Sequence, residues 1–250
     1  MRLAFVCDFD GTVSPTDVGA ALVRRFTTDR GRVAGLVERW RAGEIGTRDV
    51  IEGECATLRV SEAESLEFVR GFDLDPGFAP FARAALERGD RVMVVSEGYD
   101  FYIRELLGRA GLGHLAWAAN RATFEGDRLV PSFPHPGASG PACMGCGNCK
   151  ARHVRSFQAG GCEVFLVGDG LSDRCAAVAA DQVLACGELL EWCRAQGIAA
   201  TPFADFADVA RHTERSAPPG GAPGGAASAA ARPGGAAHDR PPRRPAGAGG

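Results

Sequence analysis

Short runs of apolar residues, each ending at polar or acidic residues, recur along the chain. The clearest cover residues 3–9, 91–96 and 163–169, and weaker ones cover residues 115–120 and 182–186. Runs of this length that stop at a turn are typical of strands buried on both faces of a parallel sheet. The pattern therefore predicts five buried strands.

Helical patterns of about three turns lie between these strands, as expected for crossover connections. They cover residues 75–89, 99–111, 148–159, 171–180 and 188–196. Strands that alternate with helices of this length indicate a parallel sheet with helices on both faces. We therefore predict an α/β fold with a Rossmann-like sheet.

Residues 16–71 interrupt the alternation, because they contain four helical patterns and no strand-like run. Thr47 is a candidate cap of the third helix, and Ser61-Glu-Ala-Glu64 forms a capping box for the fourth. We predict an all-helical cap at 16–71, inserted into a core of residues 1–15 and 72–214. The alternative is a first crossover enlarged by surface helices.

A second interruption, at residues 121–133, predicts a β-hairpin that turns at Phe124-Glu-Gly-Asp127.

Composition divides the chain into a globular part and a tail. The whole chain is 45% hydrophobic and 24% charged, with a net charge of −3. This argues against binding to nucleic acid or membrane surfaces. No run approaches the roughly 18 apolar residues of a membrane span, so we expect a cytoplasmic protein.

Residues 215–250 contain 11 Ala, 9 Gly, 7 Pro and 5 Arg and no Ile, Leu, Val, Met or aromatic residue, which predicts a disordered tail.

Acidic residues gather at the ends of two predicted strands. Asp8 and Asp10 end the first, and Asp169 and Asp173 follow the run at 163–169. The carboxyl ends of parallel strands meet at one edge of the sheet, where ligands usually bind. Carboxylates that converge there repel one another unless a cation lies between them. The pattern predicts a magnesium site, because Mg²⁺ prefers oxygen ligands.

Two further segments suit a phosphate group. Ser96-Glu97-Gly98 ends another predicted strand and offers a hydroxyl and backbone N–H groups at the start of a helix. Lys150 begins a helix after a glycine-rich segment and supplies a compact positive charge. We predict that these residues bind a phosphoryl group.

A cluster of thiols precedes Lys150. Cys143, Cys146 and Cys149, with His153 one helical turn further on, offer three sulfur atoms and one nitrogen. Such a set suits tetrahedral zinc, and zinc here would fix the segment before Lys150. The alternative is a glycine-rich loop with packed or free thiols.

In order and spacing, these segments resemble the haloacid dehalogenase superfamily of phosphotransferases. The resemblance spans residues 1 to about 210 and rests on Asp8-x-Asp10-Gly11-Thr12, Ser96, Lys150 and Gly168-Asp169-Gly170-x-x-Asp173. It implies that Asp8 is a nucleophile that forms an aspartyl-phosphate and that Asp10 is the acid and base. It also implies that Asp8, the Asp10 carbonyl and Asp169 bind Mg²⁺, and that Asp173 orients Lys150 or a metal-bound water.

Asp10 favours phosphoester hydrolysis over dehalogenation, since dehalogenating members of the superfamily lack a carboxylate at this position. Cys146-Gly-Asn-Cys149-Lys150 resembles the methionine-salvage phosphatases, which act on a methylthiopentenyl phosphate, and the phosphoethanolamine/phosphocholine phosphatases. Phosphoserine phosphatases share the predicted cap type. We therefore expect a small phosphate ester as substrate and a monomer or homodimer. A phosphomutase and a noncatalytic binding protein on the same fold remain alternatives.

Overall fold

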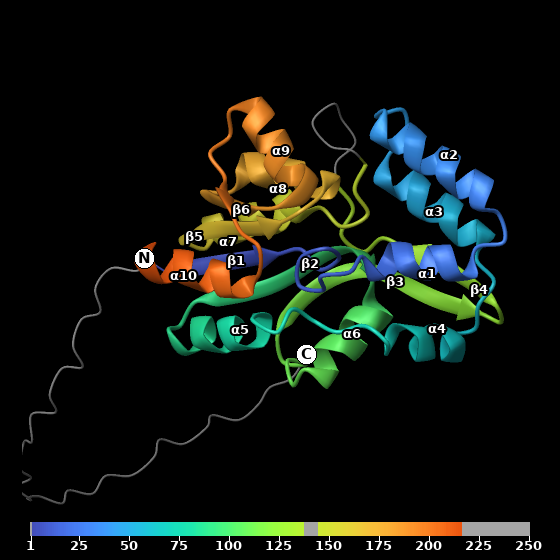
Figure 1. Cartoon of the computed structure of the whole chain (residues 1–250), viewed down its shortest axis with the longest axis horizontal. Coiled ribbons are helices and arrows are strands. Elements are labelled where there is room, and N and C mark those ends of the chain that lie inside the picture. The colour runs from blue at the N-terminus through green and yellow to red at the C-terminus, as the bar shows by residue number, and fades with distance from the viewer. Residues whose placement is uncertain (1, 138–144, 217–250) are drawn as a thin grey trace, which may run out of the picture. The chain divides into compact units, whose positions relative to one another are not determined.

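The computed structural model describes residues 2–137 and 145–216, and its strands form one sheet (Figure 1). Their order across the sheet is β4-β3-β2-β1-β5-β6-β7. Every neighbouring pair is parallel except the antiparallel pair β3 and β4. The strands are β1 (Arg2–Cys7), β2 (Arg91–Tyr99), β3 (Ala116–Glu125), β4 (Arg128–Ser132), β5 (Cys162–Gly168), β6 (Gln182–Ala185) and β7 (Thr201–Pro202).

All five predicted buried strands are confirmed, as β1, β2, β3, β5 and β6. The hairpin at 121–133 is also present, as the pair β3 and β4. Its turn contains Gly126 at a φ of 67°, a conformation that glycine adopts without steric cost. The α/β prediction with a Rossmann-like sheet is therefore confirmed.

Helices cover both faces of the sheet (Figure 1). One face packs against α5 (Phe78–Glu87), α6 (Asp100–Arg109) and α10 (Phe206–Ser216). The other packs against α7 (Lys150–Ala159), α8 (Arg174–Ala179) and α9 (Gly187–Gln196). A short 3-10 turn, η1 (Leu171–Asp173), precedes α8.

Strand β1 shows why the sheet is buried on both sides. Side chains alternate between the two faces of a strand. Leu3, Phe5 and Cys7 join the core on one face, and Ala4 and Val6 join the core on the other. Because both sets are apolar, β1 can occupy the centre of the sheet only with helices on either side.

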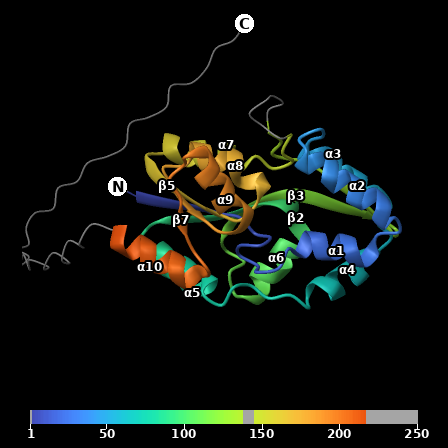
Figure 2. The ribbon, with the colours of Figure 1, turned by 45° about the horizontal axis from the view of Figure 1, so that its top comes forward.

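The predicted helical block consists of α1 (Val18–Phe26), α2 (Arg30–Arg41), α3 (Thr47–Thr57) and α4 (Glu62–Val69). Helices α2 and α3 lie side by side (Figure 2). The Ser61 capping box is confirmed. Thr47 is the first helical residue and Gly46 the N-cap, so the predicted cap of α3 was wrong by one residue. The division into cap and core stays a prediction.

The sequence pattern missed α10 and the two-residue strand β7. Helix α10 ends at Ser216, inside the predicted tail, and residues 217–250 lie outside the described residues. Across the described part of the chain, none of the helices combines the length and apolar character needed to cross a bilayer. The cytoplasmic location stays a prediction.

Candidate active site

The carboxyl ends of β1 and β5 lie side by side at the centre of the sheet. Their parallel pairing aligns Cys7 with Val167, and the Asp8 N–H donates to the Val167 carbonyl at 2.9 Å. Asp8 follows β1 directly, and Asp169 follows β5 directly. The register of two neighbouring strands therefore brings these carboxylates to one edge, as the sequence predicts.

Three carboxylates converge at this edge, and we call Asp8, Asp169 and Asp173 the acidic triad. Each offers an oxygen within 4.8 Å of the others. Asp173 Oδ2 accepts the N–H groups of Asp169 and Gly170 at 3.2 and 3.1 Å, which tightens the turn after β5. Gly168 is required for this close approach, since a Cβ there would lie 2.6 Å from the Asp173 carboxyl carbon.

Lys150, the first residue of α7, supplies the positive charge of the site. Its Nζ lies 2.8 Å from Asp8 Oδ1, 2.6 Å from Asp173 Oδ1 and 2.9 Å from Ser172 Oγ. The side chain is fully buried. Burial disfavours the charge, but Asp173 and Asp8 outweigh it and raise the pKa of Lys150 above its ordinary value. Lys150 therefore stays protonated between two carboxylates.

The acidic triad is more negative than one lysine can balance. Burial and then the charge of Asp173 raise the pKa of Asp8 well above its usual range, although Lys150 opposes the rise. The same two causes raise the pKa of Asp169 to about 6. Repulsion of this kind is what a bound divalent cation relieves.

The Asp10 carboxylate lies outside the acidic triad, in a pocket of hydrogen-bond donors. Its Oδ1 accepts the N–H groups of Val18 and Gly19, at 2.8 and 3.3 Å, at the start of α1. Its Oδ2 accepts from Tyr102 Oη at 2.7 Å and from Ser96 Oγ at 3.2 Å. Burial and the charge of Asp17 raise the pKa of Asp10 to about 7, although the hydrogen bonds from Tyr102, Gly19 and Val18 oppose the rise.

Ser96 and Glu97, both in the predicted phosphate-binding segment, contact different parts of the molecule. The Ser96 hydroxyl faces Asp10 and also accepts the Gly98 N–H at 2.8 Å. The Glu97 carboxylate contacts a different segment, accepting the N–H groups of Gly147 and Asn148 at 2.9 and 3.2 Å. Binding of phosphate by Ser96, Glu97 and Gly98 stays a prediction, but the side chain of Glu97 is already committed to this segment.

The zinc prediction receives no support. Cys143 lies outside the described residues, and Cys146 and Cys149 pack in a small apolar cluster with Ala151. His153 Nε2 lies 2.9 Å from Asn148 Oδ1. Among residues 2–137 and 145–216, the acidic triad alone brings three metal-ligating groups together. Cys-x-x-Cys spacing permits zinc, but the described members of the set do not converge.

Several side chains of the site were not singled out from the sequence. Thr12 belongs to the first acidic motif but was given no role there, and its Oγ1 donates to Asp169 Oδ1 at 3.0 Å. Tyr102 reaches Asp10 from the first turn of α6, six residues after Ser96. Asn148 Nδ2 donates to the Ser96 carbonyl at 2.9 Å. Such pairings join distant segments, and no local pattern reveals them.

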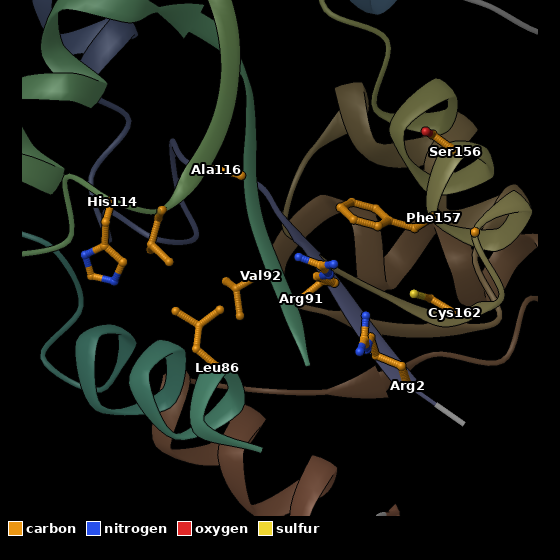
Figure 3. A pocket seen from close by; sticks show the side chains of 11 residues that line it. Arg2, Leu86, Arg91, Val92, His114, Ala116, Ser156, Phe157 and Cys162 are labelled. Carbon is orange, nitrogen blue, oxygen red and sulfur yellow. The ribbon is translucent and has the colours of Figure 1, made fainter. Parts of the chain in front are cut away.

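A hollow of about 450 Å³ lies elsewhere in the molecule (Figure 3). Arg2, Arg91, Ala116 and Cys162 line it, at the amino ends of their strands. The carboxylates of the acidic triad are at the carboxyl ends of β1 and β5 instead. The hollow is therefore separate from the site described here.

Comparisons with known proteins agree with this geometry. The profile of haloacid dehalogenase-like hydrolases matches residues 5–177. A 2-hydroxy-3-keto-5-methylthiopentenyl-1-phosphate phosphatase of Exiguobacterium sp. is 30% identical over 219 residues, covering 85% of this chain and 97% of the relative. A protein of the same name from Brevibacillus brevis is 28% identical over 214 residues, covering 84% and 94%.

Solved structures show the same fold. A phospho-aspartyl intermediate analogue of phosphoserine phosphatase superposes with a TM-score of 0.65 at 16% identity, covering 84% of this chain and 98% of that one. A substrate-bound phosphoserine phosphatase complex gives a TM-score of 0.64 at 15% identity, covering 85% and 98%.

Proposed function

We propose that this chain, which belongs to the haloacid dehalogenase-like hydrolase family and is a phosphatase, hydrolyses 2-hydroxy-3-keto-5-methylthiopentenyl-1-phosphate. The proposed reaction requires Mg²⁺. The observation that carries the mechanism is the position of Asp8. Its carboxylate lies 2.8 Å from the Lys150 ammonium and has an oxygen within 4.8 Å of carboxylate oxygens of Asp169 and Asp173. A nucleophile in this position lies next to both the Lys150 ammonium and a candidate binding site for a metal ion.

The acidic triad fits a hard divalent cation. In the described part of the chain, Oδ2 of Asp8 and Oδ2 of Asp169 accept no hydrogen bond, whereas both oxygens of Asp173 are occupied. Asp8 and Asp169, with the backbone carbonyl of Asp10, would hold the ion. When bound, Mg²⁺ would offset the negative charge of the carboxylates and of the phosphoryl oxygens.

Asp8 and Lys150 would carry the first half of the reaction. One Asp8 oxygen attacks phosphorus, the bond from phosphorus to the ester oxygen breaks, and an aspartyl-phosphate forms. Lys150 would stabilise the negative charge of the phosphoryl oxygens, since its ammonium is fixed by Asp173 and Ser172. Asp173 would thus act by orienting Lys150.

Asp10 would carry the proton transfers. A carboxyl with a pKa of about 7 holds its proton for part of the time at neutral pH, which suits a group that first gives and then takes one. Asp10 would protonate the leaving alcohol, and its carboxylate would then take a proton from the water that hydrolyses the aspartyl-phosphate. Tyr102, Ser96 and the start of α1 hold the carboxylate in one orientation for both steps.

The substrate part of the proposal rests on the relatives. The Exiguobacterium and Brevibacillus proteins carry the same name and align with the chain over more than nine-tenths of their own length. The phosphoserine phosphatase structures support the fold alone, because their identity to this chain is 15–16%.

We also propose that α1 to α4 form a cap over this edge of the sheet. Two contacts support this arrangement. Arg48, in the first turn of α3, donates its backbone N–H to the Gly145 carbonyl at 3.1 Å, close to the segment that precedes Lys150. Arg41, at the end of α2, forms a 2.8 Å ion pair with Glu188 at the start of α9.

The test is a phosphate-release assay on this substrate, phosphoserine, phosphocholine and a generic aryl phosphate. We expect the highest kcat/KM on the methylthiopentenyl phosphate and complete loss of turnover in Asp8→Asn, whose amide cannot form the acyl-phosphate. Circular dichroism would check that this variant is folded. Turnover by Asp8→Asn within tenfold of the wild type would refute the mechanism, and a preference for phosphoserine or phosphocholine would refute the substrate.

A further inference from the structure

Glu97 makes contacts that the proposed reaction does not use. It follows Ser96 in β2, and neighbouring side chains of a strand point in opposite directions. Ser96 accordingly reaches Asp10, while the Glu97 carboxylate reaches the segment of residues 145–149. There its Oε2 accepts two consecutive backbone N–H groups, from Gly147 at 2.9 Å and from Asn148 at 3.2 Å.

Burying a carboxylate costs desolvation free energy, so a buried carboxylate is expected to make hydrogen bonds that compensate for the cost. Burial raises the pKa of Glu97, while the charge of Lys150 and the two N–H donors oppose the rise. Within the described residues, no cation lies within ion-pair distance of Glu97. An apolar side chain of similar size would fill this space at a lower desolvation cost. What the acid adds is a strong acceptor for the two N–H groups.

Further hydrogen bonds and close packing also restrain the segment of residues 145–149. Asn148 is fully buried, and its side chain donates to the Ser96 carbonyl at 2.9 Å and pairs with His153 Nε2 at 2.9 Å. The N–H of the next residue, Cys149, donates to the His135 carbonyl at 2.9 Å. Gly147 has no spare room, since a Cβ there would lie 2.6 Å from Asn120 Oδ1. Together with the two hydrogen bonds to Glu97, these contacts restrain the backbone at residues 147–149.

This segment leads directly to Lys150. Cys149 is the N-cap of α7 and Lys150 its first residue, so only one residue separates Asn148 from the lysine. The three polar contacts of Nζ are 2.6 to 2.9 Å long, and each tolerates only a small displacement. A shift of the backbone at Asn148 would therefore move the ammonium relative to Asp8.

We infer that Glu97 is a positioning residue for Lys150, and that its carboxylate fixes the Gly147-Asn148 backbone so that the ammonium meets the phosphoryl group. The inference deepens the proposed function and rests on it. It assigns to an acid in β2 the role that zinc bound by the cysteines would otherwise play, which is to hold a glycine-rich segment before the lysine.

Three variants test this role: Glu97→Ala, Glu97→Gln and, as a matched control, Glu125→Ala. Glu125 is an exposed glutamate at the end of β3 with no contact to the site. The amide oxygen of Glu97→Gln can still accept both N–H groups, and its NH₂ takes the place of Oε1, which is buried without a partner in the described part of the chain. Each variant is assayed for hydrolysis of an aryl phosphate, for melting temperature, and for the amide NMR signals of Gly147 and Asn148.

We expect Glu97→Ala to lower kcat by roughly tenfold to a hundredfold, since a misplacement of about 1 Å can have that effect. KM should change less than kcat. Glu97→Gln should recover at least a third of the wild-type kcat and keep the Gly147 amide signal near its wild-type position. Should Glu97→Ala fail to fold, Gly147→Ala tests whether the position of this backbone decides the rate, because its Cβ would clash with the side chains of Asn120 and Phe133. A kcat within threefold of the wild type in Gly147→Ala would then overturn the inference.

The inference is overturned if Glu97→Ala keeps a kcat within threefold of the wild type. It is equally overturned if Glu97→Gln is as slow as Glu97→Ala, because charge rather than backbone position would then decide the rate. These results are distinct from failure of the proposed function, in which the wild-type protein itself releases no phosphate or Asp8→Asn remains active.

Discussion

The hydrogen bond from Tyr102 to Asp10 offers a measurable test of how the site holds its acid. Tyr102→Phe removes one oxygen from a fully buried ring and leaves Asp10 Oδ2 with Ser96 Oγ alone, at 3.2 Å. A hydrogen bond to a charged group contributes about 1.5–3 kcal/mol, and one between neutral groups about 0.5–1.5 kcal/mol. The free energy lost by Tyr102→Phe should therefore depend on whether Asp10 is ionised.

The pKa of Asp10, about 7 in the folded protein, sets the pH window. Because this pKa is raised above the unfolded value of 3.8, the Asp10 contribution to stability is complete below that value and is lost as pH rises towards 7. Tyr102→Phe removes a donor to the charged form, so it raises the pKa further and deepens this loss. At about pH 8.5 we expect a cost of about 2–3 kcal/mol, and at about pH 5.5 a cost near 1 kcal/mol.

The assay is urea unfolding of wild type and variant at both pH values. Tyr99→Phe is the matched control, because Tyr99 is also buried but its hydroxyl contacts the Cys55 thiol, at 2.9 Å. Its cost should be about 0.5–1.5 kcal/mol at either pH. The alkaline limb of kcat/KM should also move upward in Tyr102→Phe, by about one pH unit for each 1.4 kcal/mol of lost interaction. An equal cost for Tyr102→Phe at both pH values would refute the reasoning.

Two further outcomes follow from the acidic triad. Lys150→Met removes the cation from between Asp8 and Asp173, so it should lower the free energy of unfolding by at least about 3 kcal/mol at about pH 8. The loss should shrink near pH 5, because burial raises the pKa of Asp8 well above its usual range and Asp8 takes up a proton as the pH falls, which urea unfolding at both pH values would show. EDTA should abolish phosphate release and Mg²⁺ restore it, whereas Ca²⁺ should support little turnover because its larger, looser coordination misplaces the nucleophile. Full activity of metal-stripped protein would contradict the metal site.

The fold was predictable because its strands are buried on both faces. Most residues of β1 and β5 are apolar, and a short apolar run of this kind is typical of a strand buried on both faces. Strand β7 has two residues, one of them proline, and carries no such signal. Helix α10 has apolar residues at helical spacing, Phe206, Val209 and Ala210, which pack on the core, so its sequence did carry a signal.

The acids of the site were predictable by the same logic, and their partners were not. The carboxyl ends of parallel strands meet at one edge of the sheet, so acids that follow buried strands, such as Asp8 and Asp169, could be placed at the same edge. The contact between Glu97 and Gly147 joins residues 50 apart, through a segment with no regular structure of its own. The zinc prediction receives no support, since spacing along a chain does not fix where side chains point, and Cys146 and Cys149 pack in an apolar cluster with Ala151.

The arrangement around Lys150 links stability and chemistry in one side chain. Its ammonium offsets the repulsion between Asp8 and Asp173, which otherwise opposes folding at neutral pH. The same charge, at the same position, is what the proposed reaction needs beside the phosphoryl group. A substitution of Lys150 therefore changes both quantities at once and cannot separate them. Glu97 acts on the position of Lys150 without touching its ammonium, so its variants are the ones that isolate the catalytic requirement from the structural one.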